Sequence, residues 1–315
     1  MPLSQDSPAR TRIWQPGRSV DIGATWGTLR RGAGDPTWRR KGAWLFRGMN
    51  TPSGAVTLGI AASPADAEVF AHAWGEPVAV DWVLDALPVM LGGDDDISGF
   101  TVRHPVLDRA WRVRLKSGWR VPKTGLVLES LIPAIIEQKV TGQEAFAGQR
   151  RLVRLWGTLA PGPGAAMDLW VPPTAQVVAG IASWQWLQMG ISPQRSDTVI
   201  RVARVADRLE ELACSDPEAA SRRMLAIPGV GLWTVAETAH RALGNADAVS
   251  FGDYHVAKNI GWVLTGDEVD DAGLAELLAS YRPHRYRVQR LVELAGLSRP
   301  RHGPRMAPRR HLPGR

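Results

Sequence analysis

The spacing of apolar residues changes near residue 77, and this change limits the folds that the chain can adopt. Before it, apolar and aromatic residues come in short runs separated by clusters of Gly, Pro, Asn and Asp. The runs are SVDIGATWGTL, GAWLFRGM, AVTLGIAA and AEVFAHAWG, and they are typical of strands. We therefore expect a β-rich unit over residues 19–75.

The next segment, VAVDWVLDALPVMLGG, has helical spacing. Val80, Val83, Leu84 and Leu87 fall on one face, and two glycines at 92 and 93 predict where the helix ends. Together with the preceding strands, this helix predicts a small α+β domain over residues 19–98.

Beyond residue 99 the helical pattern dominates. In LVLESLIPAIIEQKVTG, Pro133 either begins the helix or kinks it, and DTVIRVARVADRLEEL reads as a second helix. The apolar stripes are Leu128, Leu131, Ile132, Ile135 and Ile136 in the first, and Val202, Val205, Leu209 and Leu212 in the second. The sequence thus predicts a mainly α-helical second domain over residues 99–298.

Both ends have the composition of disordered segments. Residues 1–18 lack an apolar period, and residues 299–315 contain six arginines, four prolines and no acidic residue. We expect a disordered N-terminal segment and a basic disordered tail. The tail either adds nonspecific phosphate contacts or is simply solvated.

The overall charge points to a polyanionic partner. The net charge is +7 and the pI is about 10.1, although a solvated basic surface gives the same values. The single cysteine, Cys214, excludes a disulfide framework, a four-cysteine zinc site and a cysteine-ligated iron–sulfur cluster. Without a leader-like segment or an apolar run of roughly 20 residues, we expect a soluble cytoplasmic protein.

A glycine-rich turn, Pro228-Gly229-Val230-Gly231, stands between two helix-like segments, SRRMLAI and LWTVAETAHRAL. The glycines allow a tight turn, while Val230 can fill the space between the helices. Amides at the start of the second helix suit a phosphate, but many helix pairs turn on glycine without any ligand.

The turn and its surroundings resemble a known family. Asp253 follows Gly231 by 22 residues, LIPAIIEQKVTGQEAFAGQ and MGISPQRSDTVIRVA match further segments, and the β-rich start followed by AWG and a helix also agrees. Over residues 20–295 the chain is similar to the helix-hairpin-helix, Gly/Pro-Asp superfamily of base-excision DNA glycosylases. Within that superfamily it resembles the AlkA-type 3-methyladenine DNA glycosylase II branch, which implies a TBP-like N-terminal β-rich domain packed on an α-helical domain.

The resemblance implies roles for particular residues. Asp253 stands at the position of the catalytic aspartate, and the turn residues 228–231 stand where the family grips a DNA phosphate, in some members with a bound monovalent cation. It implies no other metal and no cofactor. Asp253 could also cap the helix YHVAKNIGW, and both uses are compatible.

One carboxylate suffices for the implied chemistry. Cleavage of an N-glycosidic bond builds positive charge on the deoxyribose, which a fixed anion stabilises while it orients a water molecule. An alkylated purine already carries positive charge and leaves without a strong general acid. Extruding the base from the duplex costs least at a damaged pair, which contributes to selectivity.

Trp233 separates two mechanisms. Bifunctional members carry a Schiff-base lysine two residues after the last hairpin glycine, and Trp233 occupies that place here. The resemblance therefore implies a monofunctional enzyme with Trp233 in the base pocket, although a core tryptophan is nearly as compatible with the pattern. We also assign Tyr254, the neighbour of Asp253, to the base pocket.

Several positions depart from the family pattern. Glu237 replaces a pocket tyrosine and would either bind a base edge or face solvent. Gln138 and Lys139 occupy the helix that supplies the intercalating residue, and we assign both to DNA binding. Glu293 replaces an aromatic residue that stands against the sugar. His240 and His255 are expected to be packing or surface residues.

The sequence thus favours a monofunctional DNA glycosylase that removes alkylated purines from duplex DNA in base excision repair. We expect a nucleoid-associated monomer that does not bind membranes. Two alternatives stay open: a glycosylase for a deaminated or oxidised base, and a non-catalytic protein that binds damaged DNA through its hairpin.

Overall fold

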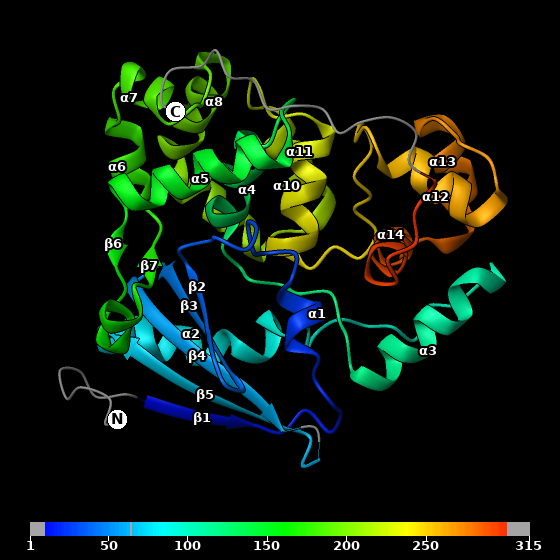
Figure 1. The fold of residues 1–315 in the computed structure, drawn as a ribbon, viewed down its shortest axis with the longest axis horizontal. Helices are drawn as coiled ribbons and strands as arrows, with labels where there is room; N and C mark the ends of the chain where they lie inside the picture. The colour runs from blue at the N-terminus through cyan, green and yellow to red at the C-terminus, as the bar shows by residue number, and fades with distance from the viewer. Residues whose placement is uncertain (1–9, 64, 301–315) are drawn as a thin grey trace.

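The computed structural model describes residues 10–63 and 65–300 (Figure 1). Its N-terminal part is a five-stranded antiparallel sheet in the order β1-β5-β4-β3-β2. The strands are β1 (Arg10–Trp14), β2 (Trp38–Lys41), β3 (Trp44–Thr51), β4 (Gly54–Ser63) and β5 (Glu68–Gly75). Three of the four predicted strands correspond to β3, β4 and β5.

Helix α2 (Pro77–Met90) packs on this sheet, as the apolar spacing predicts. The four residues of its predicted face are all buried, together with the inward side chains Val56, Leu58 and Ile60 of β4. Each such side chain contributes roughly 1.5–3 kcal/mol of burial free energy. The α+β character of the first domain is therefore confirmed.

The segment SVDIGATWGTL is not a strand, and that prediction was wrong. Residues Ile22–Trp26 form the short helix α1, because the Asp21 side chain accepts a hydrogen bond from the Ala24 amide (2.9 Å) and caps it. Trp26 is buried and donates from Nε1 to the Met90 carbonyl (2.8 Å). A local cap and one buried ring thus outweigh the strand-like composition.

The N-terminal segment also departs from expectation. Residues 10–14 form edge strand β1, which pairs with β5 from Arg10 opposite Ala73 to Trp14 opposite Val69. Side chains of β1 reach α2, where Arg12 lies 3.0 Å from Asp85. Disorder is therefore the wrong prediction for residues 10–14, whose pairing partner lies nearly 60 residues away. Residues 1–9, and residues 301–315 of the predicted tail, lie outside the described residues.

The rest of the chain is mainly helical, and Figure 1 shows its helices beside and above the sheet. The helices are α3 (Asp108–Ser117), α4 (Val127–Ile136), α5 (Gly142–Trp156), α6 (Ala175–Gly180), α7 (Ser183–Gln188), α8 (Pro193–Ala203), α9 (Ala206–Glu210), α10 (Pro217–Leu225), α11 (Leu232–Thr238), α12 (Val256–Thr265), α13 (Asp271–Leu278) and α14 (Arg285–Leu294). Between α5 and α6, β6 (Thr158–Leu159) pairs with β7 (Trp170–Val171). Short 3₁₀ turns span Pro105–Leu107, Gly162–Met167, Glu211–Cys214 and Ala279–Tyr281.

Helix α4 lies at the centre of the helical core. All five residues of its predicted stripe are buried, and Pro133 sits inside the helix rather than at its start. The second predicted helix is interrupted, because the backbone leaves helical geometry at Val205 and separates α8 from α9. Val202, Leu209 and Leu212 are nevertheless buried in the same core as α4.

Two arginines of the N-terminal domain pair with glutamates in and just after α4. Arg47 of β3 contacts Glu129 and stands between the rings of Trp26 and Trp38, at 5.6 and 5.0 Å from their centroids. Arg31, in the loop after α1, lies 3.3 Å from Glu137, the residue that ends α4. These ion pairs, each between a buried arginine and a half-buried glutamate, fix the N-terminal domain against the helical domain.

None of the helices in residues 10–63 and 65–300 is both long enough and apolar enough to cross a membrane.

Candidate active site

The Pro-Gly-Val-Gly turn joins α10 to α11 as a tight hairpin. Gly229 adopts a φ of +93°, and a Cβ atom there would lie 2.2 Å from Thr198 Oγ1 of α8, so both conformation and space require glycine. Val230 is buried in the core between the helices, as its place in the turn predicts. Residues 228, 229 and 231 are exposed. The hairpin therefore presents its backbone at the surface.

Side chains from α8 and from the end of α4 hold the hairpin. Gln138 Nε2 donates to the Gly229 carbonyl (3.0 Å) and to Thr234 Oγ1 (2.8 Å), while Arg201 donates to the Pro228 carbonyl (2.5 Å). The carbonyls of Ile227 and Gly231 accept backbone hydrogen bonds. Four carbonyls of the hairpin segment thus accept hydrogen bonds, one of them from a guanidinium.

Lys139 follows Gln138 and is exposed. Its φ of +54° lies in the left-handed region, an unusual conformation for a residue with a side chain. It does not line the cavity described below. Gln138 therefore braces the hairpin from inside, whereas Lys139 points out from the surface beside it.

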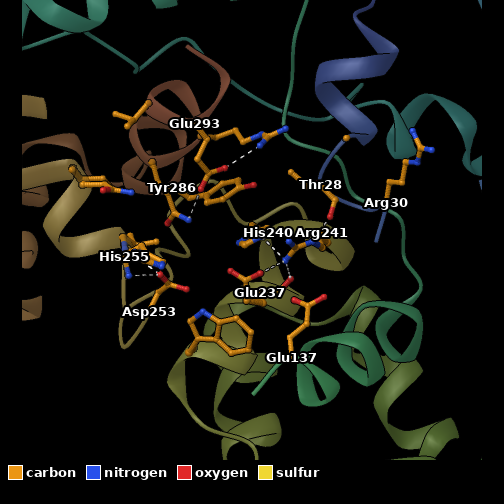
Figure 2. Close-up of a pocket in the computed structure, with 18 of the residues that line it drawn as sticks. Thr28, Arg30, Glu137, Glu237, His240, Arg241, Asp253, His255, Tyr286 and Glu293 are labelled. Carbon is orange, nitrogen blue, oxygen red and sulfur yellow. Dashed lines mark hydrogen bonds and ion pairs between the residues drawn. The ribbon is translucent and has the colours of Figure 1, made fainter. Parts of the chain in front are cut away.

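A cavity of about 440 Å³ lies between the two domains. Its wall combines the loop after α1, the end of α4, one residue of α5, the segment from α11 into the next turn, the start of α12, and α14. Figure 2 shows Asp253 and His255 on one side, Glu137 on the other, and Glu237 between them. The cavity therefore brings together residues that are more than 100 positions apart in the sequence.

Asp253 lies in the turn before α12. Its Oδ1 atom accepts hydrogen bonds from the amides of His255 (2.7 Å) and Val256 (3.1 Å), which begin that helix. Among the described residues, no donor bonds to Oδ2. The predicted capping role is thus present, and it uses only one of the two carboxylate oxygens of a side chain that lines the cavity.

Glu237 is buried and also lines the cavity. Oε2 accepts from Arg241 (2.6 Å) and Oε1 accepts from Ser250 Oγ (2.5 Å), so both oxygens are engaged. Burial alone would raise the pKa of Glu237, but the positive charge of Arg241, aided by the hydrogen bond from Ser250, lowers the pKa to about 2. Glu237 therefore neither faces solvent nor offers a free oxygen to a base edge.

The helix continues past α11 as a π-helical turn, Ala239–Leu243, a feature frequent at functional sites. This turn places His240 and Arg241 side by side, with Arg241 donating to His240 Nε2 (2.8 Å). His240 stacks on Tyr286 of α14 with ring centroids 3.9 Å apart. Burial, reinforced by the Arg241 charge, lowers the pKa of His240 to about 3, so it is a neutral packing residue, as expected.

Of the other residues predicted near the pocket, Trp233 and Glu293 line the cavity and Tyr254 does not. Trp233 lines the cavity, and its Nε1 atom is buried without a hydrogen-bond partner among the described residues. Glu293 also lines the cavity, where it accepts from Gln289 (3.0 Å) and Arg290 (2.9 Å). Tyr254 does not line it: the side chain is 72% exposed and its ring stacks under the Lys258 ammonium. Assigning Tyr254 to the pocket was therefore wrong, because its side chain is exposed to solvent and lies outside the cavity lining.

Five charged residues of the cavity were not among the site residues predicted from the sequence: Arg30, Arg31, Glu137, Arg241 and Arg290. Arg241 stands four residues after Glu237, a spacing that indicates a helical ion pair and could have been found. Glu137 directly precedes Gln138, but its place in the cavity depends on the tertiary fold. Nothing in the sequence places Arg31 near either of them, because it comes from the other domain.

No group of three or more His, Cys, Asp or Glu side chains within the described ranges could hold a metal ion.

The fold has close counterparts among solved structures. A 3-methyladenine DNA-glycosylase from Archaeoglobus fulgidus aligns over 89% of this chain and 97% of its own, with a TM-score of 0.73 and 16% identity. The chain has the fold of the helix-hairpin-helix DNA glycosylases. An 8-oxoguanine glycosylase/lyase from Clostridium acetobutylicum aligns over 93% of this chain and 99% of its own, with a TM-score of 0.67 and 12% identity.

Sequence similarity points in the same direction. The chain is 28% identical over 171 residues, 54% of its length, to a probable bifunctional transcriptional activator/DNA repair enzyme AlkA of Mycobacterium tuberculosis, present in two strains. It spans about a third (31%) of the length of these curated relatives. No protein-family model matches the chain. The solved structures support the helix-hairpin-helix architecture, and the curated relatives support the AlkA-type resemblance.

Proposed function

We propose that this protein is a monofunctional DNA glycosylase that acts as a monomer on duplex DNA and hydrolyses the N-glycosidic bond of alkylated purines. One observation carries the proposal. Asp253, one of whose carboxylate oxygens accepts no hydrogen bond from the described residues, lines an interdomain cavity beside a tight Pro-Gly-Val-Gly hairpin in a glycosylase fold.

The chemistry follows from where the charge develops. As the bond to the base breaks, the deoxyribose takes on oxocarbenium character, and a fixed carboxylate stabilises it more strongly in a cavity than in bulk water. The amides of His255 and Val256 hold Oδ1, so the Asp253 side chain is oriented before the substrate arrives. Oδ2 is left to face the sugar or to orient the attacking water.

The cavity suits an extruded base. Its volume falls within the roughly 300–1,000 Å³ typical of small-ligand pockets. Trp233 and Phe146 line it, and the electron-rich face of Trp233 would attract a purine that carries positive charge through alkylation. A neutral leaving group then departs without a general acid.

The absence of a suitable lysine supports a hydrolytic route without strand cleavage. Trp233 stands where a Schiff-base lysine would, and among the described residues no lysine lines the cavity. Water activated beside Asp253 is then the nucleophile. The exposed hairpin backbone, Lys139 and the net charge of +7 would serve to hold the phosphates of the duplex.

The proposal is tested by the release of free bases from methylated duplex DNA, with separation of the products by chromatography. Wild-type protein should release 3-methyladenine or 7-methylguanine. The Asp253→Asn variant should lose roughly 10²–10³-fold in rate, the scale of removing one transition-state charge interaction, while it keeps most of its DNA affinity.

An unmethylated duplex serves as the blank. If wild type binds the duplex but releases neither base, the alkylpurine assignment is excluded. Deaminated and oxidised duplexes would then separate a glycosylase for another lesion from a non-catalytic binding protein.

A further inference from the structure

The charged groups of the cavity differ in how completely they are engaged. Glu237 uses both oxygens within the protein, as described above. Glu137 has only its ion pair with Arg31, and no donor among the described residues hydrogen-bonds to its carboxylate. The acceptor capacity of this wall of the cavity therefore resides in Glu137.

Arg31 is similarly incomplete although it is only 7% exposed. Its Nε atom lies 3.3 Å from Glu137 Oε1 but makes no hydrogen bond. One terminal nitrogen reaches the Thr28 carbonyl at 3.4 Å, and the other has no acceptor within the described residues. Buried guanidinium groups normally have their donors satisfied. Arg47 and Glu129 also leave polar atoms unpaired, but they lie outside the cavity, whereas the open positions of Arg31 and Glu137 belong to residues that line it and are accessible to a bound partner.

A carboxylate beside a guanidinium presents acceptors next to donors. The Watson–Crick edge of guanine presents the complement, since it has an O6 acceptor followed by the N1–H and N2–H donors. Adenine offers a donor at N6 and an acceptor at N1, and its C2 position carries no donor. An adenine-derived base would thus pair with only one oxygen of the half-buried Glu137 carboxylate, whereas a guanine-derived base pairs with both.

Resting on the proposed glycosylase function, we propose that Arg31 and Glu137 form a recognition pair that selects a guanine-derived base in the cavity. Arg31 donates to O6, and Glu137 accepts from N1–H and N2–H. The alkylated or oxidised position of the base lies away from this edge, so 7-methylguanine and 8-oxoguanine share the chemistry that the pair recognises.

The chain supplies a matched control for this pair. Glu129 lies on α4 and, like Glu137, contacts a buried arginine of the N-terminal domain, but neither Glu129 nor Arg47 lines the cavity. Glu129→Gln therefore breaks an equivalent interdomain ion pair and leaves the base-contacting wall unchanged. Glu137→Gln removes the same charge inside the cavity.

The experiment compares release of 7-methylguanine and 3-methyladenine from one duplex methylated with dimethyl sulfate, corrected for lesion content and for spontaneous loss. A second duplex carries a single 8-oxoguanine. Wild type should favour the guanine-derived base. Glu137→Gln should reduce that preference about tenfold, the scale of one well-formed base-edge contact, while Glu129→Gln leaves it unchanged.

The outcomes distinguish the proposed recognition pair from the proposed glycosylase function. If wild type prefers 3-methyladenine, the recognition pair is refuted but the glycosylase function is not. An equal loss of both activities in Glu137→Gln has the same meaning. Release of 8-oxoguanine alone refutes the alkylpurine assignment yet supports the pair, provided that Glu137→Gln lowers it. Release of no base refutes both. The wild-type ratio needs no variant, and Arg31→Lys, which keeps the charge but loses the planar donors, provides a second test if Glu137→Gln does not fold.

Discussion

Glu237 and Asp253 line the same cavity, and the structure uses their carboxylates in opposite ways. Glu237 is buried, bonded through both oxygens and held at a lowered pKa by Arg241. Asp253 is partly exposed and bonds to two backbone amides through one oxygen only. The comparison teaches that the contacts already made by its oxygens indicate which role a carboxylate at a candidate site can take. Glu237 has a structural role, whereas Asp253 keeps one oxygen available for chemistry.

The largest expected effect is on stability. Glu237→Gln should lower the free energy of unfolding by about 3–5 kcal/mol, because it leaves the buried Arg241 guanidinium without its counter-charge. Asp253→Asn should cost no more than a few tenths of a kcal/mol, since asparagine caps a helix about as well as aspartate. Urea unfolding of both variants checks the contrast, and equal losses would abolish the distinction.

The stability of the protein in acid should also depend on the ion pair between Glu237 and Arg241. The folded pKa of Glu237 is about 2, below its ordinary value of 4.5, so the carboxylate contributes stability that is fully present above pH 4.5 and is lost as the pH falls toward 2. The Glu237→Gln variant should therefore show a smaller loss of stability than wild type across this range. Parallel acid titrations at fixed urea measure the difference, and superimposable slopes would mean that Glu237 is not the titrating group.

A smaller effect tests the capping use of Asp253. Replacing Asp253 by Ala removes both hydrogen bonds to the start of α12 and should cost about 1 kcal/mol, within the range of 0.5–2 kcal/mol for lost caps. Both Asp253→Asn and Asp253→Ala should lose base excision, but Asp253→Asn should keep the stability that the helix cap provides. Chemical denaturation beside the base-release assay separates the roles, and an Asn variant as unstable as the Ala variant would argue against capping.

The smallest effect concerns Tyr254. Its side chain is 72% exposed and does not line the cavity, so Tyr254→Ala should change both stability and excision only slightly, by less than about 0.5 kcal/mol. Trp233→Ala, in the cavity wall, is the informative partner and should lower excision. A large loss of base release with Tyr254→Ala would restore Tyr254 to the base pocket.

Much of the fold could be predicted because local patterns agree with tertiary packing. The apolar faces of α2 and α4 and the strands β3 to β5 are evident from spacing alone. The failures, at α1 and β1, occur where a side-chain cap or a partner strand distant in sequence decides the structure. Local propensity contains neither kind of information.

The candidate site divides in the same way. The sequence by itself determined the hairpin, whose glycine conformation is a local backbone requirement, and the placing of Asp253 at a fixed distance after it. Only the tertiary structure decided that Arg31 and Glu137 meet in one wall of the cavity, that Glu237 is neutralised by Arg241, and that Tyr254 points away. The physical reason is that burial and charge pairing depend on the packing of elements distant in the sequence, and no spacing along the chain encodes these contacts.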